Sequence, residues 1–187
     1  MFFVSDALLD QILADDIPYG DATTALLGIE KVPGIVRCRP KAETTIAGVT
    51  LAERLFARVG LQTTRFHEEG DTVAAGTVIL EGRGSAGAIH AVYKTAQNIL
   101  EYASGIATRT HQMVEEARVG NPLCRVAVTR KHFPGTKTLS LYAAITGGAV
   151  VHRMGLSESV LVFDQHRVFI ADFEKRLTEA KKAEPER

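Results

Sequence analysis

The chain has 187 residues, and its 22 basic and 22 acidic side chains balance to no net charge. At roughly 150 residues per domain, this length predicts one large domain or two small ones. The hydrophobic content of 45% excludes a disordered protein. The lack of a basic excess argues against a nucleic-acid or membrane-surface binder. The chain has neither a long charge-free run nor a secretory signal, so we expect a cytoplasmic protein whose Cys38 and Cys124 stay reduced.

The first part of the chain carries the pattern of amphipathic helices. Apolar residues recur at helical spacing in three segments, which are residues 5–13, 49–59 and 86–117. We expect Gly105 to interrupt the third helix, because glycine is a poor helix former. The polar residues 21–24 predict a turn after the first helix.

Strands accompany these helices. Residues 35–38 read as a strand, and residues 69–82 contain short β-rich runs divided by glycines, which indicates antiparallel strands. The Asn-Pro pair that starts at residue 121 ends the region. We therefore divide the chain into domains at 1–121 and 122–187.

The second part follows a different order. Strand, helix, strand and helix patterns follow one another at residues 125–129, 139–147, 160–163 and 169–183. Alternation of this kind predicts an α/β arrangement, with parallel strands and helices outside them. We expect Ile170, Phe173 and Leu177 to form the inner face of the last helix.

The densest cationic segment, residues 129–137, reads TRKHFPGTK and directly follows a predicted strand. Loops after parallel strands are where α/β folds bind ligands. Arg130 offers a planar fork to carboxylates or phosphates, and Lys131 and Lys137 offer mobile charges, so the segment suits a polyanionic small molecule. The alternative is a solvated basic loop.

Other groups could also carry chemistry. His152 and Arg153 lie in a short connection after paired glycines and could bind an anion, with the histidine as a possible acid. The alternative is a capped helix with a surface pair. Lys94 lies on the third predicted helix, among polar residues. The acidic residues 15–21 could hold Mg²⁺, although we favour a capped turn there. No histidine has metal-ligand spacing.

Four motifs occur in an order that resembles the quinolinate phosphoribosyltransferase family, also called nicotinate-nucleotide pyrophosphorylase (carboxylating). They are residues 16–23 (DIPYGDAT), 98–108 (NILEYASGIAT), 129–137 (TRKHFPGTK) and 147–156 (GGAVVHRMGL). Within the family, residues 101–103 and 162–166 are most similar to the ModD branch of molybdenum-transport operons.

The resemblance implies an N-terminal open β-sandwich with helices, followed by the first βα units of an incomplete α/β barrel. It implies transfer of a phosphoribosyl group from phosphoribosyl pyrophosphate, with Mg²⁺, to a pyridine or other aromatic carboxylate. It also implies a homodimer in which the partner's N-terminal domain completes each site.

The motif positions imply roles for single residues. Arg130, His152 and Arg153 would bind the carboxylates of the acceptor, and Lys131 would act beside the acceptor and the phosphoribosyl group. Lys94 stands where the family has an arginine that reaches across the dimer, and Lys137 also replaces an arginine as a possible loop contact. A lysine keeps the charge of an arginine but loses its bidentate fork.

Two departures from the family pattern bear on activity. Phe163 replaces a substrate-binding lysine, which leaves the acceptor open among aromatic carboxylates. The second departure concerns the family's later barrel strands, which supply acidic residues for the ribose and Mg²⁺ and are not found in this sequence. Residues 122–187 hold about two βα units at roughly 30 residues each, so we expect the amino-terminal portion of a barrel with exposed strands. Three readings stay open. They are a phosphoribosyltransferase, a truncated non-catalytic module for anion binding or dimerisation, and an oxyanion binder related to molybdate.

Overall fold

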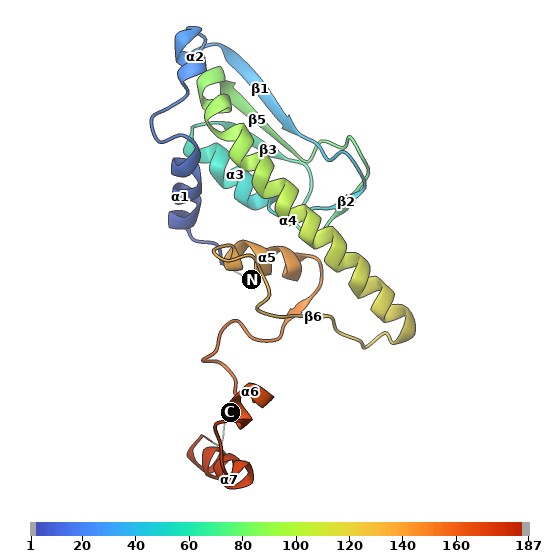
Figure 1. The fold of residues 1–187 in the computed structure, drawn as a ribbon. Coiled ribbons are helices and arrows are strands. Elements are labelled where there is room, and N and C mark those ends of the chain that lie inside the picture. Colours follow the sequence, from blue (N-terminus) through green and yellow to red (C-terminus); the bar gives the residue numbers. More distant parts are fainter. Residues whose placement is uncertain (1–2, 185–187) are drawn as a thin grey trace.

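The computed structural model describes residues 3–184 (Figure 1). The helices are α1 (Asp6–Asp16), α2 (Ala22–Leu26), α3 (Val49–Arg58), α4 (Ala86–Gly120), α5 (Lys137–Thr146), α6 (Asp164–Arg167) and α7 (Phe173–Ala183). The strands are β1 (Pro33–Cys38), β2 (Thr44–Thr45), β3 (Gln62–Arg65), β4 (Thr72–Val73), β5 (Leu80–Ser85), β6 (Ala127–Val128) and β7 (Val150–Val151). The mixture of helices and strands confirms the predicted α/β class.

The N-terminal part contains an antiparallel sheet with the strand order β1-β5-β3. The pattern of residues 69–82, in which glycines divide short β-rich runs, predicts antiparallel strands of this kind. Strand β5 needs glycine at residue 82, because a Cβ there would lie 2.8 Å from Cδ2 of Phe56. On the same strand, the buried Glu81 pairs with Arg37 (2.6 Å) and Arg83 (2.8 Å). The Arg37 guanidinium, and then that of Arg83, hold the pKa of Glu81 below its ordinary value.

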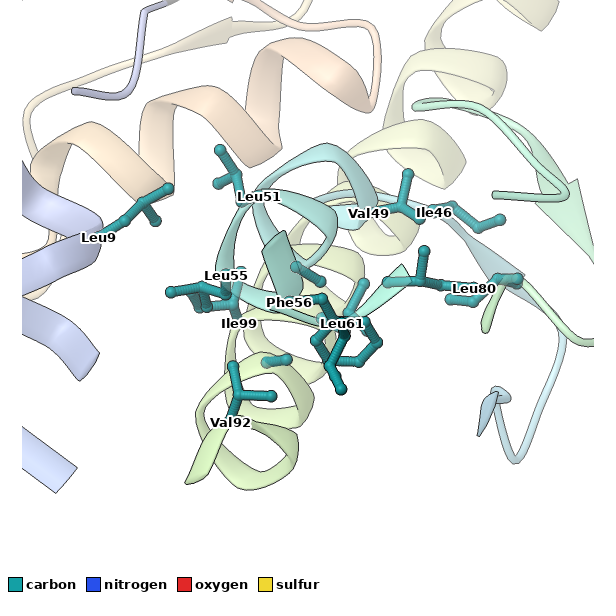
Figure 2. Close-up of a cluster of buried hydrophobic side chains, with 14 of the residues drawn as sticks. Leu9, Ile46, Val49, Leu51, Leu55, Phe56, Leu61, Leu80, Val92 and Ile99 are labelled. Atoms are coloured by element: carbon teal, nitrogen blue, oxygen red, sulfur yellow. The ribbon is translucent and has the colours of Figure 1, made fainter. Parts of the chain in front are cut away.

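The main hydrophobic core lies between this sheet, α3 and α4 (Figure 2). Leu55 and Phe56 of α3, Leu80 of β5 and Val92 of α4 are fully buried there. Leu9 brings α1 onto the same core, and Ser5 caps that helix by accepting the backbone N–H of Leu8. Burial of these side chains supplies the driving force that holds three separate segments together.

Helix α4 runs through 35 residues without a break, so the predicted interruption at Gly105 is wrong. Glycine costs a helix only about 1 kcal/mol, and the buried face of α4 outweighs that cost. Ile99, Ala103, Ala107 and Val114 all lie on this face. In Figure 1 the helix crosses the whole N-terminal part and continues past it.

The predicted polar turn at residues 21–24 is instead the start of the short helix α2. Asp21 is its N-cap and accepts the backbone N–H groups of Thr23 and Thr24. The hydroxyl of Thr24 lies 2.5 Å from the same carboxylate, and these hydrogen bonds lower the pKa of Asp21. A helix of five residues is too short to show apolar residues repeating at helical spacing, so the sequence pattern does not predict it.

The C-terminal part attaches to the rest through α5. Gly147, which ends α5, packs so closely on α4 that a Cβ there would lie 2.5 Å from the carbonyl oxygen of Ala107. On the other side, Glu69 accepts the backbone N–H groups of Gly48 and Thr50 at the start of α3. Burial, and then this same carboxylate, raise the pKa of Tyr142 on α5. These contacts fix α5 against both α3 and α4.

Three predictions for the C-terminal part need correction. Residues 160–163 form no strand, and their side chains are exposed. The second strand is β7, which pairs with β6 in parallel. The last long helix begins at Phe173 and buries no residue, so Ile170, Phe173 and Leu177 form no inner face. A strand needs a neighbour for its backbone, and the described residues place none beside 160–163.

No described helix is long and apolar enough to span a membrane.

Candidate anion-binding site

Two cationic segments leave the same end of the β6–β7 pair. Val128 lies opposite Val151 in a parallel register, and the backbone N–H of His152 donates to the carbonyl oxygen of Val128 (3.0 Å). Arg130 and Lys131 follow β6 after one residue, and His152 follows β7 directly. The structure therefore joins two groups that are separated by about twenty residues in the sequence, at the carboxyl end of parallel strands, where α/β folds bind ligands.

A cavity of about 900 Å³ opens beside this strand end. Lys131 and His132 of the loop after β6 line one part of it, and Asp16, Asn98 and Tyr102 of α1 and α4 line another. Most of the remaining lining is apolar and comes from α1, α4 and α5. Cavities of this size and makeup are typical of small-molecule sites.

The cations of the first segment are available to a ligand. Arg130, Lys131 and Lys137 are exposed, and among residues 3–184 none of them has an ion pair or a side-chain hydrogen bond. Lys137 is the first residue of α5, after the turn at Gly135, whose φ of 83° favours glycine. The structure places Lys131 in the cavity lining, whereas Arg130 and Lys137 are outside it.

The second segment is arranged differently. Arg153 is only 9% exposed, and its Nη1 donates to the carbonyl oxygen of Ser159 (3.3 Å). One arm of the guanidinium thus holds the loop that follows β7, and its other donors remain for a ligand. His152 is exposed. The backbone N–H of Met154 donates to the carboxylate of Glu158 (2.6 Å), which closes the same loop.

Lys94 does not join this cluster within the chain. Its Nζ donates to Oε1 of Gln97 (3.2 Å), and Nε2 of Gln97 donates to Glu101 (2.7 Å). Gln97 and Glu101 line a different cavity of about 620 Å³, between α4 and the segment after β1. The exposed Lys94 therefore lies on α4 outside the cavity that contains Lys131.

The sequence analysis missed three residues of the larger cavity as site residues. Asp16, Asn98 and Tyr102 all lie in recognised motifs. Asp16 was considered only among the acidic residues 15–21 that could hold Mg²⁺, and Asn98 and Tyr102 received no role. The hydroxyl of Thr95 donates to Oδ2 of Asp16 (3.0 Å), which ties the end of α1 to α4. Their helical spacing put Asn98 and Tyr102 on one face of α4, but only the tertiary structure shows that this face lines the cavity of Lys131.

The described residues do not fit a protein-held Mg²⁺ site. Within residues 3–184, no three His, Cys, Asp or Glu side chains lie close enough together to hold a metal ion. Asp21 is occupied as the cap of α2, and the carboxylate of Asp15 accepts a hydrogen bond from Gln11. The described residues therefore offer Mg²⁺ no set of protein ligands.

Comparison with known sequence families covers nearly the whole chain. Residues 21–104 match the N-terminal domain of quinolinate phosphoribosyl transferase, and residues 106–187 match its C-terminal domain. The chain belongs to the quinolinate phosphoribosyl transferase family. The two matches meet inside α4, and the domain division after residue 121 stays a prediction.

Individual relatives agree with this assignment. The chain is 38% identical to "Putative pyrophosphorylase ModD" of Pasteurella multocida and 41% identical to the protein of the same name from Rhodobacter capsulatus. It covers 61% and 65% of these relatives, which cover 92% and 90% of the chain. The chain thus spans less than two thirds of their length.

Solved structures in the family share the fold. NadC from Streptococcus pyogenes superposes with a TM-score of 0.88 at 26% identity, over 97% of this chain and 64% of that one. The nicotinate-nucleotide pyrophosphorylase from Francisella tularensis gives 0.87 at 26% identity, over 100% of this chain and 67% of that one. The family recognised from the four motifs is thus confirmed, and the roles of single site residues stay predictions.

Proposed function

We propose that this chain supports phosphoribosyl transfer from phosphoribosyl pyrophosphate to an aromatic carboxylate of the quinolinate type, with release of pyrophosphate. The main support for the proposal is one observation. Two cationic segments lie at the same end of β6 and β7, beside a largely apolar cavity. The cations suit the phosphates and carboxylates, and the apolar walls suit an aromatic ring. Membership of the quinolinate phosphoribosyl transferase family supports the reaction class.

In this reaction the protein forms no covalent bond with the substrates. The bond between the ribose C1 and the pyrophosphate oxygen breaks, with pyrophosphate leaving as an anion. The new bond joins C1 to a nucleophilic atom of the acceptor, which in a pyridine carboxylate is the lone pair of the ring nitrogen. Holding the two reactants together and stabilising the leaving charge are the main contributions to the rate. In this proposal Lys131 neutralises the phosphates in the cavity, while Arg130, His152 and Arg153 orient the carboxylates of the acceptor.

We further propose a homodimer in which Lys94 serves the partner's site. Lys94 is exposed and lies outside the cavity of its own chain that contains Lys131, as expected if its ligand is bound by another copy. Its hydrogen bond to Gln97 holds the ammonium on the outer face of α4. Mg²⁺ would arrive with the pyrophosphate group, as part of the donor substrate.

Pyrophosphate release tests the proposal. Wild-type protein, incubated with phosphoribosyl pyrophosphate, MgCl₂ and a panel of pyridine and other aromatic carboxylates, should release pyrophosphate with at least one acceptor. Lys131→Ala should abolish most of this release, and Lys175→Ala, which removes an exposed lysine on α7, should not. Release that Lys131→Ala leaves unchanged would contradict the proposed site.

A second candidate is a module that binds an anion without turnover. Phe163 favours it, because an apolar ring, 48% exposed, stands where the family resemblance expects a substrate-binding lysine. Saturable binding of phosphoribosyl pyrophosphate with no release for any acceptor would support this candidate. Including molybdate in the titration would test the oxyanion reading at the same time.

A further inference from the structure

His90 lies on α4 one helical turn before Lys94, so the two side chains share one face of the helix. Gln97 and Glu101 continue this face and form the hydrogen-bond chain that begins at Lys94. None of these four residues lines the 900 Å³ cavity that contains Lys131. This face of α4 therefore lies outside the chain's own cationic site.

The imidazole of His90 is held in one orientation. Its Nδ1 lies 2.7 Å from the hydroxyl oxygen of Thr24, a residue that is only 2% exposed. The same hydroxyl lies 2.5 Å from Oδ2 of Asp21, the N-cap of α2. The ring also meets the ring of Tyr93 edge to face, with the centroids 6.2 Å apart. Contacts from α2 and α4 thus fix an imidazole that is itself exposed.

These hydrogen bonds decide which nitrogen of the ring carries the hydrogen. Hydrogen bonds, first that of the Thr24 hydroxyl, lower the pKa of Asp21, so its side chain is an ionised carboxylate that only accepts. The hydroxyl hydrogen of Thr24 goes to Asp21, and the hydroxyl oxygen accepts from Nδ1 of His90. In the neutral imidazole, Nε2 then has no hydrogen. Nε2 also has no hydrogen bond within residues 3–184. His90 therefore presents a fixed acceptor one turn from the ammonium of Lys94.

A ligand for this face needs two features. Lys94 has three hydrogen-bond donors and a positive charge, which suit a carboxylate. Nε2 of His90 suits a hydrogen-bond donor, such as a hydroxyl or amino group. The Cβ atoms of residues four positions apart on a helix are about 5–6 Å from each other, so both side chains can contact one small molecule. An aromatic carboxylate with a hydroxyl or amino substituent has both features.

We propose that His90 contacts the acceptor in the partner subunit's site, beside Lys94, and selects aromatic carboxylates that carry a hydroxyl or amino group. The inference rests on the proposed function, because that function supplies the acceptor and the homodimer. His90 acts through Nε2, while Thr24 and Asp21 are positioning residues that hold the ring. The α4 face of one chain thus determines the acceptor specificity of the cationic site of the other.

Mixed dimers test whether His90 acts across the dimer. Two variants are co-expressed, and pyrophosphate release is measured with phosphoribosyl pyrophosphate, MgCl₂ and an acceptor. In a dimer of one His90→Phe chain and one Lys131→Ala chain, one of the two sites keeps both residues, which no site does in either variant alone. Random pairing makes half of the dimers mixed, so release should recover to about a quarter of the wild-type value.

Two further mixtures are matched controls. Arg130→Ala with Lys131→Ala should recover no release, because both changes lie in the same loop and every site then carries one of them. His90→Phe with Lys94→Ala should also recover none, because both changes lie on the same face of α4. A purely structural role of His90 within its own chain would prevent recovery with Lys131→Ala.

The choice of acceptor tests the contact itself. The panel pairs pyridine and benzene carboxylates that carry a hydroxyl or amino group with their unsubstituted parents. The wild type should favour a substituted acceptor, and His90→Phe should lower this preference about tenfold, as expected for the loss of one hydrogen bond. Lys175→Ala should leave the preference unchanged. His90→Gln, which keeps a donor for Thr24, should lower the preference as well, even where His90→Phe loosens α2.

The outcomes separate this inference from the proposed function. If the wild type releases pyrophosphate but the mixture of His90→Phe with Lys131→Ala recovers none, this inference is wrong and the proposed function stands. The same conclusion follows if the wild type does not favour substituted acceptors or if both His90 variants keep its preference. If the wild type releases no pyrophosphate with any acceptor, the proposed function itself fails, and this inference fails with it.

Discussion

The close contact between α5 and α4 predicts that Gly147→Ala destabilises the fold. The backbone of Gly147 has a φ of −74°, so alanine is not strained there, and the only obstacle is space. The added Cβ would lie 2.5 Å from the carbonyl oxygen of Ala107 and 2.8 Å from Cβ of Thr110. Neither neighbour is the free end of a side chain, so the two helices must move apart.

The expected magnitude follows from this geometry. Overpacking a tight contact typically costs about 1–3 kcal/mol, and a clash with backbone belongs near the upper end. For a chain of this size, each 1 kcal/mol lowers the melting temperature by about 2–4 °C. We therefore expect the melting temperature of Gly147→Ala to fall by roughly 5–10 °C.

Gly105→Ala supplies the matched control on α4. A Cβ at Gly105 meets nothing within 4 Å, and the residue lies inside a continuous helix. Replacing this glycine should stabilise the protein by about 0.5–1 kcal/mol. Thermal unfolding followed by circular dichroism measures both variants. Equal melting temperatures for Gly147→Ala and the wild type would refute the close packing of α5 on α4.

Other predictions concern single groups. Folding lowers the pKa of Glu81, because its carboxylate pairs with Arg37. The free energy of unfolding should therefore fall as the pH drops from about 4.5 through the lower pKa of the folded state. Glu81→Gln should reduce this pH dependence in acid unfolding curves. Burial raises the pKa of Cys38 to about 11, so a thiol reagent at pH 8 should label the exposed Cys124 at least tenfold faster; equal rates would contradict the burial. Arg153→Ala removes the bond to the loop after β7, and limited proteolysis within 154–162 should quicken about tenfold, whereas an unchanged rate would place that loop under other control.

Local signals in the sequence predicted most helices but failed where tertiary contacts decide. The helices that begin at Asp6 and Val49 follow from apolar spacing. The predicted break at Gly105 is wrong, because the low helix propensity of glycine is a small cost beside the burial along α4. The apolar residues 160–163 looked like a strand, although a strand depends on a neighbour that a local pattern does not show.

The candidate site divides in the same way. Motif order singled out Arg130, Lys131, His152 and Arg153, and the parallel pairing of β6 with β7 brings these two distant motifs to the same end of the strands. No local pattern could show that Arg153 is buried. None could place Asp16 in the cavity of Lys131 either, because that depends on how α1 packs against α4.

Direct binding of the donor tests the central claim most closely. Phosphoribosyl pyrophosphate with MgCl₂ is titrated calorimetrically into the wild type, Lys131→Ala and the control Lys175→Ala. If the cationic site is correct, the wild type and the control bind the ligand saturably. The binding free energy of Lys131→Ala should be weaker by about 1.5–3 kcal/mol. No binding by the folded wild type, or equal affinity for Lys131→Ala, would contradict the assignment of an anion site at the end of β6 and β7.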